Sequence, residues 1–128
     1  MPITPVKDMV ADAKTRIQSL SPEEARRRVE ERNALLVDIR DAREIERDGE
    51  VPGAFHAPRG MLEFWVDPHS PYHKPQMAGR PLILFCASSW RSALSADTLQ
   101  KMGVDDVAEI DGGFKAWESA GAPVQRTT

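Results

Sequence analysis

The sequence predicts one α/β domain built on a parallel sheet with helices on both sides. Short apolar runs alternate along the chain with segments of helical periodicity, which is typical of strand–helix–strand units. The run at residues 82–85 is apolar at every position, as a strand covered on both faces requires. The length of 128 residues is ordinary for one compact domain with a single core.

Residues 1–20 predict an added amphipathic helix, followed by a domain at residues 21–128. Thr4 is a candidate cap and Pro5 takes the first helical position. The apolar stripe of this helix consists of Val6, Met9, Val10, Ala13, Ile17 and Leu20. We expect the stripe to pack on the domain itself, with docking to a partner or closure of a homodimer as alternatives.

Two more helices are predicted to begin at capping boxes. Ser21 precedes Glu24 by three residues, and Asp41 precedes Glu44 by the same spacing. Gly49 is expected to end the second of these helices.

The first half of the chain also carries two predicted strands and a long surface excursion. Residues 34–37 form a short apolar run, and residues 54–57 form a brief one that Pro58 closes. Residues 59–81 contain one expected helical turn and four prolines, which exclude long regular structure.

The second half repeats the alternation of strand and helix. Residues 82–85 predict a strand, and residues 90–102 predict a helix that Gly103 ends. Residues 107–110 predict another strand and residues 114–119 a last short helix.

Composition and charge exclude several classes of protein. The net charge is -3 and the basic residues lie among acidic ones, so nucleic acid is not an expected partner. No stretch approaches the ~18 apolar residues of a membrane span, and the start of the chain lacks a secretory leader, so a cytoplasmic location is expected. No cofactor motif is indicated, and the prolines around His69 and His73 argue against a metal site.

The single cysteine, Cys86, follows a predicted buried strand and precedes a helix. Ligands of parallel sheets bind beyond such strand ends, and amide groups at a helix start favour an anion. Ala87, Ser88 and Ser89 are small enough for a tight loop, and the two hydroxyls add donors. With Arg91 nearby, we expect an accessible, nucleophilic thiolate, whereas an inert packed thiol is the alternative.

Four segments spanning residues 35–117 resemble the rhodanese family. They are L-L-V-D-I-R, V-P-G-A-F-H-A-P, L-I-L-F-C-A-S-S-W-R-S and D-G-G-F-K-A-W, in that order. The resemblance implies a five-stranded parallel sheet and a six-residue loop from Cys86 to Arg91 that cradles a persulfide. Ala87, Ser88, Ser89 and Trp90 would then bind the substrate. The family often has glycine at the position of Ser89, and Trp90 is bulky for the rim of such a loop.

The resemblance implies a sulfurtransferase that takes sulfur from a small anion such as thiosulfate. With no second cysteine, the acceptor must be external, for example cyanide, glutathione or a partner protein. A non-catalytic interaction module and a persulfide carrier are the alternatives. A cysteine phosphatase is disfavoured, because the phosphatase loop is one residue longer and usually follows a histidine, where this chain has Phe85.

Two other polar positions lie at predicted strand ends. Asp38 and Arg40 are expected to form an ion pair, and a contribution to ordering the cysteine loop is the alternative. His56 is expected to be a hydrogen-bonded core histidine rather than a ligand.

Overall fold

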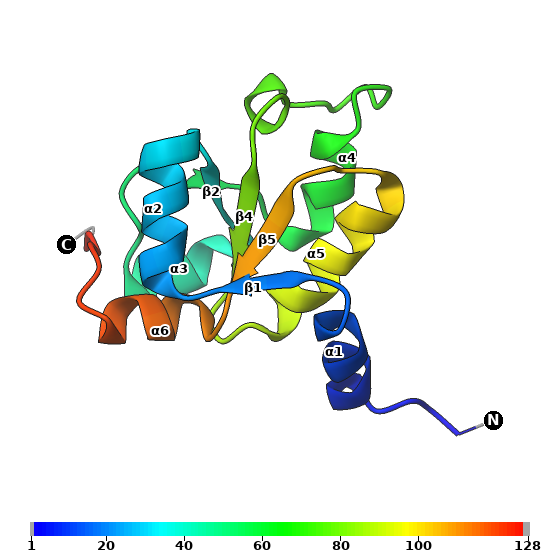
Figure 1. The fold of residues 1–128 in the computed structure, drawn as a ribbon, viewed down its shortest axis with the longest axis horizontal. Helices are drawn as coiled ribbons and strands as arrows, with labels where there is room; N and C mark the ends of the chain where they lie inside the picture. The colour runs from blue at the N-terminus through cyan, green and yellow to red at the C-terminus, as the bar shows by residue number, and fades with distance from the viewer. Residues whose placement is uncertain (1, 127–128) are drawn as a thin grey trace.

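The computed structural model describes residues 2–126 and contains one parallel sheet of five strands (Figure 1). The strands are β1 (Gln18–Leu20), β2 (Leu35–Asp38), β3 (Phe55–His56), β4 (Leu82–Phe85) and β5 (Val107–Ile110). Their order across the sheet is β1-β5-β4-β2-β3, and every neighbouring pair is parallel. The predicted α/β class and the five-stranded parallel sheet are confirmed.

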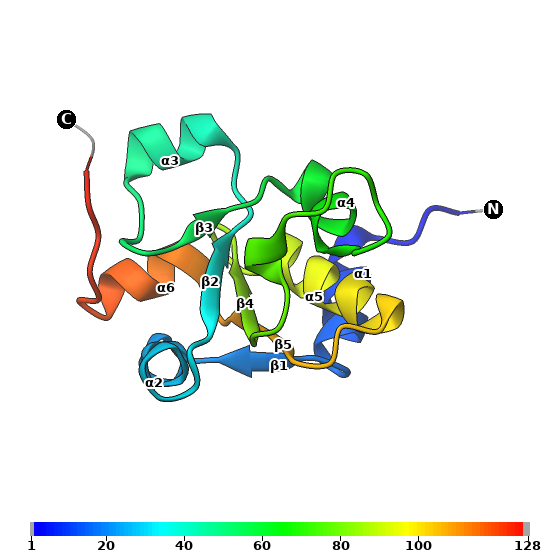
Figure 2. The same cartoon turned by 90° about the horizontal axis from the view of Figure 1, so that it is seen from above.

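Helices cover both faces of this sheet, as Figure 2 shows from above. They are α1 (Val6–Lys14), α2 (Pro22–Arg32), α3 (Ala42–Asp48), α4 (Leu62–Val66), α5 (Trp90–Met102) and α6 (Gly113–Ser119). The predicted capping boxes at Ser21 and Asp41 are confirmed, because each side chain accepts the amide of the glutamate three residues on. In return, Glu24 and Glu44 accept the amides of the two cap residues.

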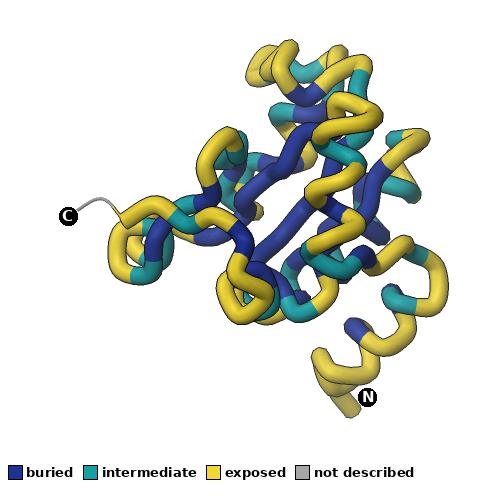
Figure 3. Tube along the Cα trace, turned by 60° about the vertical axis from the view of Figure 1, so that its left-hand side comes forward, coloured by how far each residue is buried: buried dark blue, intermediate teal, exposed yellow. Residues whose placement is uncertain are grey.

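The sheet divides the interior into two hydrophobic cores. Leu84 points into the core that holds Leu99 of α5, whereas Phe85 points into the core that holds Trp117 of α6. Because alternate side chains face opposite cores, the whole strand must be apolar, and Figure 3 shows the central strands buried. The prediction from residues 82–85 is therefore confirmed.

The amino-terminal segment differs from the prediction. The helix ends at Lys14, and residues 18–20 form β1, which pairs with β5 from Gln18 opposite Ala108. The predicted helix over residues 15–20 is wrong, because Leu20 is buried as part of an edge strand. The spacing of Ile17 and Leu20 also fits the apolar stripe of a helix. Periodicity therefore did not distinguish a helix from a strand in this segment. Thr4 is not the cap either, since the helix begins after Pro5.

The excursion between β3 and β4 contains α4 and two 3-10 turns, Arg59–Met61 and Pro75–Met77. Leu62, Val66 and Met77 are buried and attach it to the sheet, so it is a covering layer rather than a free loop. Within residues 2–126 no helix has the length and apolar character to cross a membrane.

Candidate active site

Cys86 follows β4 directly, at the carboxyl edge of the sheet and before the first turn of α5. The strand ends of β2 and β5 flank it, because both pair with β4. The topology therefore brings side chains from three strands and the start of α5 to this edge.

The loop after β4 turns back so that one amide points at the sulfur. The Ser89 N–H donates to the Cys86 Sγ at 3.1 Å. To do so, Ser89 adopts a φ of 102°, in the left-handed region that favours glycine. Ser89 thus holds a backbone conformation that residues with a side chain rarely adopt.

The start of α6 supports this loop through its backbone. The Phe114 N–H donates to the Cys86 carbonyl at 2.7 Å, and the Lys115 N–H donates to the Ala87 carbonyl at 3.1 Å. Gly113 makes the approach feasible, because a Cβ there would lie 2.5 Å from the Cys86 carbonyl oxygen. Residues 113–115 therefore brace the cysteine loop, which means that their backbone holds it in place by hydrogen bonds and close contact.

Arg91 points across the loop to α3, where it forms a two-bond ion pair with Glu44. Its Nη1 and Nη2 donate to the two carboxylate oxygens, each at 2.8 Å. This pairing lowers the pKa of Glu44 from 4.5 to about 2. The pKa of Arg91 is raised, chiefly by the hydrogen bonds to Glu44 and to a smaller degree by the charge and hydrogen bonding of Cys86. Arg91 thus ties the start of α5 to α3.

The sulfur is less accessible than the sequence led us to expect. Cys86 is only 1% exposed and belongs to the core that contains Leu84 and Ala96. The prediction that Cys86 is accessible is wrong, because its side chain packs into the core beneath the loop.

The remaining loop residues differ in how they face solvent. Ala87 is half-buried and Ser88 is exposed. Trp90 begins α5 with half of its surface exposed. Ser88 and Trp90 therefore form the outer surface of the loop, whereas Ser89 is buried.

Glu109 of β5 is a site residue that the sequence analysis missed. It lies behind the loop, is fully buried, and accepts hydrogen bonds from the hydroxyls of Ser89, Ser92 and Ser19. The hydroxyl of Ser89 therefore faces this carboxylate rather than an anion at the sulfur. A glutamate inside an otherwise apolar strand was the signal that could have identified it.

Asp38 and Arg40 form the expected ion pair at the end of β2, and the pair is buried. Arg40 donates to Asp38 through Nε at 3.0 Å and Nη2 at 2.7 Å. Its guanidinium lies over the Phe114 ring, 4.1 Å from the ring centre. Since the Phe114 amide binds the Cys86 carbonyl, the pair also contacts the brace of the loop.

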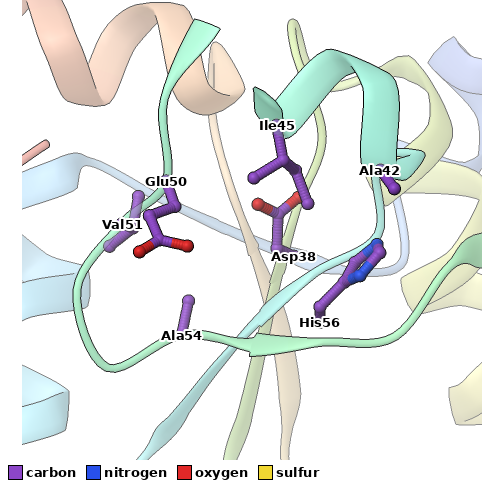
Figure 4. Close-up of a pocket in the computed structure, with 7 residues that line it drawn as sticks. All are labelled: Asp38, Ala42, Ile45, Glu50, Val51, Ala54 and His56. Atoms are coloured by element: carbon purple, nitrogen blue, oxygen red, sulfur yellow. The ribbon is translucent and has the colours of Figure 1, made fainter. Parts of the chain in front are cut away.

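A hollow of about 160 Å³ lies beside this ion pair, away from Cys86. Figure 4 shows Asp38, Glu50 and His56 around it. His56 is half-buried, and its Nε2 lies 2.7 Å from the Arg40 carbonyl oxygen, so the expected hydrogen bond of this histidine is present. No group of three or more metal-ligating side chains gathers here or elsewhere in residues 2–126.

Comparison of the sequence with known proteins identifies its family. A family model described as a rhodanese-like domain matches residues 21–120. The chain belongs to the rhodanese-like family. It is also 33% identical over 94 residues to an uncharacterized protein of Synechocystis, a match that covers 73% of this chain and 48% of that protein. The chain thus spans about half the length of that curated relative.

Solved structures share the rhodanese-like fold. A Rhodopseudomonas palustris protein of unknown function, named as a possible tyrosine phosphatase, is 46% identical with a TM-score of 0.89, over 98% of this chain and 99% of that one. The polysulfide-sulfur transferase homodimer of Wolinella succinogenes is 27% identical with a TM-score of 0.73, over 95% and 88%. A thiosulfate sulfurtransferase of Pseudomonas aeruginosa shares the fold at 20% identity and a TM-score of 0.70, over 87% and 20%.

Proposed function

We propose that this chain is a sulfurtransferase in which Cys86 accepts a sulfane sulfur as a persulfide and passes it on. The proposal depends on one observation, the Cys86 sulfur held at 3.1 Å by the Ser89 amide in a rhodanese-like domain. An N–H directed at a sulfur stabilises the anionic form of that sulfur.

In the first step, the Cys86 thiolate attacks the outer sulfur of a donor such as thiosulfate. The S–S bond of the donor breaks, sulfite leaves with the bonding electrons, and a new S–S bond forms at Cys86. In the second step, an external nucleophile takes the terminal sulfur and releases the thiolate. The acceptor must be external because Cys86 is the only cysteine in the chain.

Arg91 is the positive group placed to attract the donor. In the structure two of its nitrogens donate to Glu44, and Cys86 is 1% exposed. We therefore expect an anionic donor to replace Glu44 as the partner of Arg91 beside the cysteine loop. Trp90 and Ser88, on the outer surface of the loop, then contact the donor.

Phosphatase chemistry is a second candidate because of the name of the Rhodopseudomonas palustris relative. Two features of this chain disfavour it. The loop from Cys86 to Arg91 has six residues, one fewer than the phosphatase loop, and Phe85 stands where cysteine phosphatases usually carry histidine.

The test is to incubate the protein with thiosulfate, polysulfide and glutathione persulfide and to measure its intact mass. We expect a gain of ~32 Da that a reducing thiol reverses and that Cys86→Ser abolishes. A gain that survives this substitution would refute the assigned site. No gain from any donor would favour a non-catalytic module, and hydrolysis of an aryl phosphate by the same sample would favour the phosphatase.

A further inference from the structure

Glu109 is a fully buried carboxylate that the steps above do not use. Its Oε1 accepts from the hydroxyls of Ser89 at 2.5 Å and Ser92 at 2.7 Å. Its Oε2 accepts from Ser19 at 2.5 Å and lies 3.7 Å from the ammonium of Lys14. Burying a carboxylate costs free energy even when it is hydrogen-bonded. A buried carboxylate directly behind the cysteine loop is therefore a candidate for a functional role.

A continuous hydrogen-bonded path connects this carboxylate to the sulfur. The Cys86 thiol donates to Ser92 Oγ at 3.6 Å, and Ser92 Oγ donates to Glu109 Oε1. The single hydroxyl hydrogen of Ser92 is also within reach of the Ser89 carbonyl, at 3.2 Å. The carboxylate is nearer and charged, so it is the stronger acceptor, and a lone pair of Ser92 stays available for the thiol.

The burial of Cys86 favours a proton acceptor inside the protein. With Cys86 only 1% exposed, its thiol has little contact with bulk water, so a hydrogen-bonded group inside the protein is the nearest acceptor for its proton. We infer that Glu109 is that group and that it receives the Cys86 proton through the Ser92 hydroxyl. The inference deepens the proposed function and rests on it, because sulfur transfer requires the thiolate.

The transfer balances without a co-reactant. The S–H bond of Cys86 breaks and its proton binds Ser92 Oγ, while the original hydroxyl proton of Ser92 moves to Glu109 Oε1. The products are a thiolate, an intact serine hydroxyl and a neutral carboxylic acid. The summed charge of Cys86, Ser92 and Glu109 is therefore unchanged. The Ser89 amide then faces the anionic sulfur.

Other charged groups face the two ends of this path. On the carboxylate side, Lys14 of α1 approaches Oε2 and is itself bound to Asp111 at 2.9 Å. On the sulfur side, Arg91 of α5 is paired with Glu44 of α3.

The test is the rate of Cys86 alkylation by iodoacetamide as a function of pH in Glu109→Gln. Glutamine keeps the shape, and its single amide oxygen can still accept from Ser89 and Ser92, although its NH2 group replaces the oxygen that accepts from Ser19. It does not take up a proton. We expect the rate near neutral pH to fall about tenfold or more, and to recover as pH rises and water takes the proton instead. Glu30→Gln, the same change at an exposed site on α2, is the matched control and should leave the rate unchanged.

The opposite result is equally informative. If Glu109 were only a fixed negative charge, its removal would relieve repulsion of the thiolate and raise the rate. A rate that rises or stays constant in Glu109→Gln overturns the inference.

Ser92→Ala provides an independent test if Glu109→Gln does not fold. It should produce a loss of similar size. Where Glu109→Gln does fold, the double variant should lose no more than either single variant. An unchanged rate in Ser92→Ala also overturns the inference. Alkylation needs no sulfur donor, so a protein that passes these tests but never gains sulfur refutes the proposed function alone.

Discussion

Replacing Gly113 with alanine should destabilise the protein by about 2–5 kcal/mol, the sum of two costs. Its φ of 60° is left-handed, which costs an alanine about 1–2 kcal/mol. The new Cβ would lie 2.5 Å from the Cys86 carbonyl oxygen and 2.8 Å from the Ala87 carbonyl carbon. Relieving that overlap separates the loop from the amides of Phe114 and Lys115, at about 0.5–1.5 kcal/mol per hydrogen bond.

Urea denaturation of Gly113→Ala and Gly121→Ala separates the two costs. Gly121 has a φ of 76°, but a Cβ there would meet nothing within 4 Å, so its variant carries only the backbone cost. We expect Gly113→Ala to lose about 1–3 kcal/mol more than Gly121→Ala, the contribution of the two hydrogen bonds. Equal losses in the two variants would refute the view that α6 braces the cysteine loop through this close contact.

Two more predictions concern ion pairs near the site. Asp38→Ala leaves the fully buried Arg40 without its carboxylate partner. The free energy of unfolding, measured by urea denaturation, should therefore fall by about 3–5 kcal/mol. A loss below about 1 kcal/mol would contradict this expectation. The folded pKa of Glu44 is about 2 against 4.5 unfolded, so its ion pair with Arg91 stabilises the protein fully above pH 4.5. That contribution is lost as pH falls from about 4.5 to 2. In Glu44→Gln, the thermal unfolding temperature should therefore depend less on pH over this range. The same pH dependence in the variant and the unchanged protein would contradict the pairing.

Local signals were sufficient for most elements. The capping boxes at Ser21 and Asp41 depend on residues three positions apart, and both are present in the structure. The strand at residues 82–85 was identified because burial on both faces requires apolar residues at every position. Strand β1 was missed because an edge strand of three residues is specified by its partner, β5, which lies about ninety residues further along the chain.

The sequence by itself determined the parallel α/β fold and the position of Cys86 after a buried strand, because both follow from local periodicity and from the order of the elements. Only the tertiary structure decided what surrounds the sulfur. Glu44 reaches Arg91 from α3, and Glu109 reaches Ser92 from β5, across contacts that no local pattern encodes. Burial of the thiol also depends on how the loop packs against the core, since exposure is a property of the assembled molecule.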